Sequence, residues 1–329
     1  MTTVSLGDMA QSWMLRRQNV TLKDQMSILT DELSKGTTSD VAAHLSGDYG
    51  YLSDIERNLR TVGGFETFAS EAKGFTAAMQ SALENVQSVS SRLSSDFLAA
   101  DNSVAAARSA MAQNAEQNFT VVVSMLNTTF AGRSLFSGRA MDGPALADAE
   151  MMLSSIRDRI AGEATQSGIV AAIDDWFATD FHSTGYQGSL TPLSGFRLGE
   201  RETVNLDLRA DNEALKSVLK NVAVAAIAGD ISDPSLQAGL LQHAGLELLG
   251  AQDGVTEIRS DLGYVEERIE EMSTRLAVER TSLDYARNEL LGIDGFETAT
   301  KLENVQHQLE TLYAVTVRLS NLSLVDFMT

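Results

Sequence analysis

Few residues in this chain have the types and the spacing that metal or acid–base chemistry requires. The four histidines are scattered, and no two of them stand four residues apart, the spacing of a metal-binding pair on one helix face. Asp174 and Asp175 precede His182 and could form a ligand cluster. We interpret that segment instead as a polar loop beside a core anchor formed by Trp176 and Phe177. The sequence therefore predicts no metal site. The histidines are His44, His182, His243 and His307.

The charged and nucleophilic residues give no catalytic arrangement either. No phosphate-binding loop, dinucleotide fingerprint or nucleophile elbow occurs, and the chain has no cysteine. An acidic cluster lies on one predicted helix, and we interpret it as a solvated coiled-coil face. We expect no enzyme activity and no cofactor. The cluster consists of Glu266, Glu267, Glu270 and Glu271.

The net charge of −20 narrows the possible partners, because so acidic a surface repels phosphate backbones and anionic lipid heads. We expect no binding of nucleic acid. No stretch is apolar enough to span a bilayer, which predicts no membrane insertion. Residues 1–17 contain Asp8 and lack a continuous apolar run, so we expect export, if it occurs, to need no cleaved signal peptide.

The elements that must position any site are long helices at both ends of the chain. All three prolines, Pro144, Pro192 and Pro234, lie in the middle, which leaves both ends free of helix breakers. Apolar residues recur at alternating spacings of three and four in two segments, the pattern of a coiled-coil seam. The first seam is Phe65, Phe68, Ala72, Phe75, Met79, Ala82, Val86, Val89 and Leu93. The second is Val255, Ile258, Leu262, Val265, Ile269, Met272 and Leu276.

The two extreme ends carry apolar stripes of their own. The first helix is predicted to end at Gly36, and a break at 292–295 precedes the last helix. Periodicity alone leaves open whether the stripes form an ordinary intramolecular bundle or bind other copies. We predict an assembly interface at Leu15, Leu22, Met26, Leu29, Leu33, Leu309, Leu312, Leu319, Leu322 and Leu324.

The middle of the chain differs from its ends. Residues 104–130 are predicted as a helix that packs on 65–93 as a hairpin. Residues 145–178 and 212–228 are also predicted as helices, whereas 185–209 are rich in Gly, Thr and Ser and include a short alternating run. We predict a mainly α fold with long antiparallel coiled-coil helices from both termini and a small mixed α/β inserted domain. The expected regions are 1–141, 142–232 and 233–329.

Three segments together resemble the flagellin superfamily, and within it the hook-filament junction proteins, or hook-associated protein 3. Residues 29–40 resemble the close of the family's first helix, through Leu33, Ser34, Gly36 and Asp40. Residues 127–138 are similar to the family's junction turn, although Ser134 replaces the usual tyrosine. Residues 309–328 resemble the C-terminal signature, through Leu322, Ser323, Leu324 and Asp326. The junction-turn matches are Asn127, Gly132, Leu135, Phe136, Ser137 and Gly138.

This resemblance implies a structural subunit that joins the hook to the filament of the bacterial flagellum. It implies export, unfolded, through the flagellar type III apparatus, with a chaperone bound to the C-terminal helix, and an extracellular location. It also implies a ring-like or helical homo-oligomer that contacts hook-associated protein 1 on one side and flagellin on the other. Two alternatives stay open at this point: flagellin itself, and a cytoplasmic coiled-coil signalling scaffold.

Overall fold

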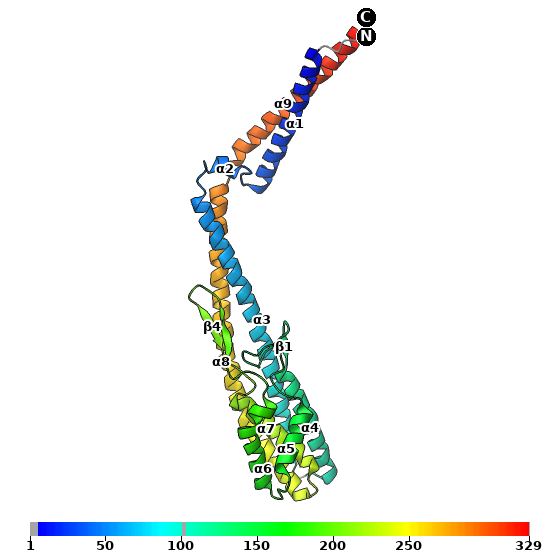
Figure 1. The fold of residues 1–329 in the computed structure, drawn as a ribbon, viewed down its shortest axis with the longest axis vertical. Helices are drawn as coiled ribbons and strands as arrows, with labels where there is room; N and C mark the ends of the chain where they lie inside the picture. The colour runs from blue at the N-terminus through cyan, green and yellow to red at the C-terminus, as the bar shows by residue number, and fades with distance from the viewer. Residues whose placement is uncertain (1–5, 101–102, 329) are drawn as a thin grey trace. The chain divides into compact units, whose positions relative to one another are not determined.

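The computed structural model describes residues 6–100 and 103–328. It confirms a mainly helical fold with two small antiparallel sheets (Figure 1). The α-helices are α1 (Leu6–Lys35), α2 (Val41–His44), α3 (Gly50–Leu98), α4 (Ala105–Leu126), α5 (Ala149–Ile160), α6 (Gln166–Asp175), α7 (Glu213–Ile227), α8 (Pro234–Leu291) and α9 (Gly295–Met328). The remaining elements are strands β1 (Thr129–Phe130), β2 (Arg133–Ser134), β3 (Leu193–Arg197) and β4 (Thr203–Leu206), the π-helix η1 (Trp176–Gly185) and the 3₁₀-helix η2 (Ala228–Asp230).

The ends of the long helices follow from local chemistry. Gly36 adopts a left-handed φ of 72°, and its N–H donates to the carbonyl of Glu32 at 2.7 Å, which closes α1 as predicted. The side chain of Asp294 accepts from the N–H groups of Phe296 and Glu297 at 2.9 and 3.0 Å and caps α9. The predicted break between the last two helices is therefore confirmed.

The chain divides into two compact units, and the divisions fall inside helices. Unit 1 consists of residues 1–62 and 278–329, and unit 2 consists of residues 63–277. One boundary thus lies within α3 and the other within α8. Among the described residues, no helix combines the length and the apolar character that a membrane span requires.

Unit 1 is built around the pairing of α1 with α9, which lie side by side (Figure 1). The turn after α1 is hydrogen-bonded to the break before α9. Thr38 N–H donates to the Leu291 carbonyl at 2.9 Å, and Ile293 N–H donates to the Gly36 carbonyl at 3.2 Å. Because the end of one helix is joined to the start of the other, α1 and α9 run antiparallel.

Unit 2 has one continuous apolar core. It buries side chains of α3, α4, α5, α6, η1, α7 and α8, with large aromatic rings at Phe75, Phe97, Phe119, Phe136 and Trp176. Residues of 142–232 share this core with the flanking helices, so the three-region division remains a proposal. The predicted hairpin of residues 65–93 and 104–130 is supported by the shared core and by Arg92, which donates to Asn118 Oδ1 at 3.1 Å.

Three local predictions are wrong. The helix predicted over 104–130 ends at Leu126, and Phe130 lies in β1, because the chain turns back there as a hairpin. Phe68 is 50% exposed, and the neighbouring Ala69 is buried in its place. The expected polar loop around His182 is helical, since α6 continues directly into the π-helix η1. The core anchor itself is confirmed, because Trp176 and Phe177 are buried.

Candidate assembly surfaces

The seam between α1 and α9 contains much of the predicted terminal stripe. Leu22, Leu309 and Leu312 are buried together with Val305, which the prediction did not include. Three further predicted residues, Leu15, Met26 and Leu29, pack half-buried against this cluster. The stripe therefore faces a partner helix of the same molecule.

The other predicted residues of the stripe differ in their surroundings. Leu33 stands in register with Leu22 and Leu29 but is 41% exposed. Among the described residues of α9, Val305 is the buried apolar residue nearest to the start of the helix. Leu33 lies beyond the level of Val305, outside the seam. Leu319 is half-buried. Leu322 and Leu324 lie within α9, but their side chains are outside the described residues.

A second apolar face of α1 is exposed. Met9, Trp13 and Val20 are 59%, 61% and 58% exposed. At 3.6 residues per turn they share one face of the helix, roughly opposite to the seam residues Leu15 and Leu22. Sequence reasoning missed this face, although the spacing of four and then seven residues was a visible signal.

The guanidinium of Arg17 lies over the Trp13 ring, 5.4 Å from its centroid, and keeps a cation beside this face. The exposed residues of α9 include Tyr313, Val315 and Val317. A hydrogen bond to the side chain of Asn19 and the nearby charge of Lys23 lower the pKa of Tyr313. The α9 surface thus combines exposed apolar side chains with polar interactions between Tyr313 and α1.

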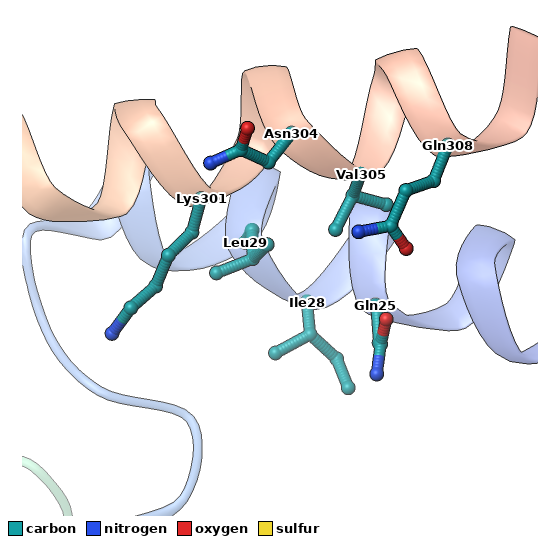
Figure 2. A pocket seen from close by; sticks show the side chains of 7 residues that line it. All are labelled: Gln25, Ile28, Leu29, Lys301, Asn304, Val305 and Gln308. Atoms are coloured by element: carbon teal, nitrogen blue, oxygen red, sulfur yellow. The ribbon is translucent and has the colours of Figure 1, made fainter.

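An open groove of about 390 Å³ runs between α1 and α9 (Figure 2). Its apolar lining comes from Ile28, Leu29 and Val305, whereas amide side chains and one lysine supply the rest. The hydrogen bond from Lys301 to Glu297, at 2.8 Å, raises the pKa of that lysine. No acid–base pair lines the groove, so it offers contact area. The lining residues are Gln25, Ile28, Leu29, Lys301, Asn304, Val305 and Gln308.

The segment that follows α1 acts as a structural connector. The carboxylate of Glu32 accepts from Ser39 N–H at 2.7 Å. Asp40 caps α2, because its Oδ1 accepts from Ala43 N–H at 3.0 Å. The His44 ring lies 3.2 Å from the Leu290 carbonyl near the end of α8. The polar residues of this sequence segment therefore fix the turn that joins α1 to the break before α9.

The predicted junction turn is a two-residue hairpin between β1 and β2. Ala131 and Gly132 both have positive φ, 50° and 78°, which is the conformation of a type I′ turn. This turn matches the right-handed twist of paired strands, and glycine adopts it without steric strain. Leu135 and Phe136, directly after β2, are buried in the core of unit 2.

Asn127 and Gly138 fasten the two ends of this turn segment. The Asn127 side chain accepts from Leu146 N–H at 2.7 Å and donates to the Leu146 carbonyl at 2.9 Å, as a neighbouring strand would. Gly138 has φ 60°, and a Cβ there would lie 2.6 Å from the Ser189 carbonyl oxygen. The structure therefore brings the predicted turn residues into one segment, in which Leu135, Phe136 and Gly138 are buried and Gly132 lies at the exposed tip.

The hairpin docks on α3 through residues that sequence reasoning did not identify. A Cβ on Gly74 would lie 2.5 Å from Cζ of Phe130, so this glycine makes room for the ring. Phe130 also meets Phe75 edge-on at 6.3 Å between centroids. Arg133 pairs with Glu71 and lies over the Phe75 ring. These contacts fix the junction turn to α3 within unit 2.

Three of the carboxylates considered for chemistry are engaged in ion pairs. Asp174 pairs with Lys220 at 2.7 Å, and Asp175 pairs with Arg159. In the acidic cluster, Glu270 binds Lys73 of α3 at 2.6 Å. Within the described part of the chain, no group of three or more His, Asp or Glu side chains is placed to hold a metal ion.

Comparison with known proteins gives a family match for one part of the chain. Residues 248–328 match the bacterial flagellin C-terminal helical region, and this range covers the later part of α8 and all of α9. This confirms the resemblance to flagellins for that segment. A search of curated proteins by sequence finds none that matches this chain.

Solved structures share the fold. The crystal structure of FlgL from Bacillus cereus is 17% identical, with a TM-score of 0.52 over 71% of this chain and 98% of that one. A candidate flagellar hook-associated protein from Vibrio parahaemolyticus is 13% identical, with a TM-score of 0.53 over 73% of this chain and 95% of that one. The likeness thus extends over nearly the whole length of the two solved chains and over 71% and 73% of this chain.

Proposed function

We propose that this chain is a non-enzymatic structural subunit of the bacterial flagellum that joins the hook to the filament. The proposal is supported by the flagellin C-terminal match over residues 248–328 and by the fold shared with the two flagellar structures. The observation that carries it is the exposed face of Met9, Trp13 and Val20. This face lies on a helix whose opposite face is already buried against α9.

Assembly would stabilise the α1–α9 helix pair. A helix pair with few buried side chains has little to offset the entropy of ordering two long helices. Neighbouring copies that cover the outer face would add about 1.5–3 kcal/mol for each fully buried large apolar side chain. The proposed assembly is a ring-like or helical homo-oligomer, with hook-associated protein 1 on one side and flagellin on the other.

The location that follows is the extracellular flagellum, reached through the type III export apparatus with the help of an export chaperone. The absence of cysteine fits a protein that folds outside the cell without disulfides. Flagellin itself is the second candidate, because the matching family model describes flagellins. The junction turn over residues 127–138, which resembles that of the junction proteins, favours the hook-filament position.

The test is deletion of this protein from a flagellated bacterium that carries it, followed by complementation of the deletion strain. Without it we expect intact hooks and flagellin monomers in the medium, and labelled wild-type protein should form a thin band at the hook tip. Label along the whole filament would instead identify a flagellin.

The double substitution Trp13→Asp with Val20→Asp tests the exposed face. We expect the variant to be exported and its unit 2 to fold after export, but we expect the variant not to be incorporated. Met151→Asp is the control, because Met151 is similarly exposed, at 56%, but lies on α5 in unit 2. Normal incorporation of the double variant would contradict the proposed role of this face.

A further inference from the structure

The boundary between the two units coincides with a pair of adjacent glycines inside α3. Unit 2 begins at Gly63, and Gly64 follows it. Glycine in a helix interior is less favourable than alanine, so two in succession weaken the helix at this point. The glycines have no packing role in the structure, because a Cβ at either would meet nothing within 4 Å.

Two other helical glycines of unit 2, Gly74 and Gly245, do have such a role. A Cβ on Gly74 would collide with the Phe130 ring, and one on Gly245 would lie 3.1 Å from Phe97 Cβ. Those positions require glycine for close approach of neighbouring groups. The pair at 63–64 lacks that reason, so its effect on the structure is confined to the backbone of α3.

In unit 2 the β3–β4 hairpin packs on α3 and α8, and its contacts with α8 end close to the boundary between the units. The β3–β4 hairpin packs Phe196 against Phe75 of α3, with 5.7 Å between ring centroids. At its tip Leu198 is fully buried, and Glu202 pairs with Arg275 of α8 at 2.7 Å. Arg275 stands two residues before Ala277, the last residue of unit 2 on α8.

The side chains of α8 become exposed immediately after the segment that contacts the β3–β4 hairpin. All residues of 277–282 are exposed, although the helix continues to Leu291. Glu279 occupies the register in which Ile258 and Val265 are half-buried and Met272 is buried. This turn and a half of α8 therefore contributes no buried side chain to either unit.

We propose that Gly63 and Gly64 form a hinge that lets unit 1 change direction relative to unit 2. The β3–β4 hairpin sets its position by stiffening the helix pair up to Arg275, and α8 follows by bending over 277–282. The hinge does not depend on the proposed function. Its consequence does: a subunit between two different tubular structures could direct its terminal helices toward either one.

The absence of cysteine makes the hinge directly measurable. Ser53→Cys places a spin label on an exposed position of α3 in unit 1, and Glu200→Cys places one on the exposed turn of the β3–β4 hairpin in unit 2. Pulsed electron paramagnetic resonance then gives the distribution of distances between the labels. We expect a broad distribution in the otherwise unmodified chain.

The double substitution Gly63→Ala with Gly64→Ala should narrow that distribution at least twofold, since alanine stiffens the helix without a steric clash. The matched control is Gly250→Ala with Gly263→Ala, two equally open helical glycines of α8 in unit 2. The control should leave the width unchanged. Equal widths in the parent and the hinge variant, or equal narrowing in the control, would overturn the proposal. Neither measurement involves flagellar assembly, so failure here is distinguishable from failure of the proposed function.

Discussion

Leu22→Ala is the substitution that most directly tests how the terminal helices are held together. Leu22 is the α1 residue buried in the seam, where it meets Val305, Leu309 and Leu312 of α9. This cluster is separate from the core of unit 2. The substitution should therefore open the α1–α9 pair and leave unit 2 intact.

The magnitude follows from the burial. Replacement of a buried leucine by alanine costs 2–5 kcal/mol, with the larger values at rigid sites that cannot collapse. Leu22 is 4% exposed but sits between only two helices, which can close around the gap, so we expect a loss of about 2–3 kcal/mol. At about 1.4 kcal/mol per factor of ten, amide exchange in the pair should accelerate roughly 30- to 150-fold.

Hydrogen–deuterium exchange followed by mass spectrometry gives this rate separately for the segments of α1 and α9. Leu33→Ala is the matched control, because Leu33 lies on the same helix and in the same register but is largely outside the seam. It should change exchange by less than about threefold. If Leu22→Ala left the pair as protected as before, or if both substitutions accelerated exchange equally, the seam would not be what holds α1 to α9.

Two further predictions concern unit 2. Asn127→Ala leaves both backbone groups of Leu146 without their partners, so it should lower the free energy of unfolding by about 2–4 kcal/mol in chemical denaturation. Burial, with a smaller contribution from the charge of Asp211, raises the pKa of Tyr186 to about 12. The unfolded tyrosine ionises near pH 10, so the contribution of Tyr186 is complete below pH 10 and decreases by about 1.4 kcal/mol per pH unit between pH 10 and 12. In Tyr186→Phe the fall in stability over this range should be shallower, and an unchanged slope would contradict the assignment.

The helices could be predicted from the sequence because their signals are local. Gly36 ends α1 and Asp294 caps α9, and each acts through its own backbone or side chain. The predicted seam failed at Phe68 because a straight helix has 3.6 residues per turn, whereas the heptad assumes 3.5. Over several heptads the buried face drifts, and Ala69 takes the inward position.

Other features depend on contacts that no local pattern contains. The π-helix η1 carries Trp176 and Phe181 at a spacing of five, and Tyr186 follows at the same spacing. That spacing is a signal only once a π-helix is considered, and such helices are rare. The fit of Phe130 over Gly74 joins residues more than fifty positions apart, and it becomes visible only when α3 and the β1–β2 hairpin are placed together.

The assembly surface shows most clearly what periodicity can and cannot decide. A regular apolar stripe such as Leu15, Leu22 and Leu29 indicates that a helix has an apolar face. It does not indicate which partner covers that face. In this protein α9 covers it, at least in part. A helix packed against a single partner needs one apolar face, and a second one on its opposite side exposes apolar surface to water at a cost. Met9, Trp13 and Val20 form that second face. Assembly is therefore supported by the apolar residues that the folded monomer leaves uncovered, independently of the stripe that α9 covers.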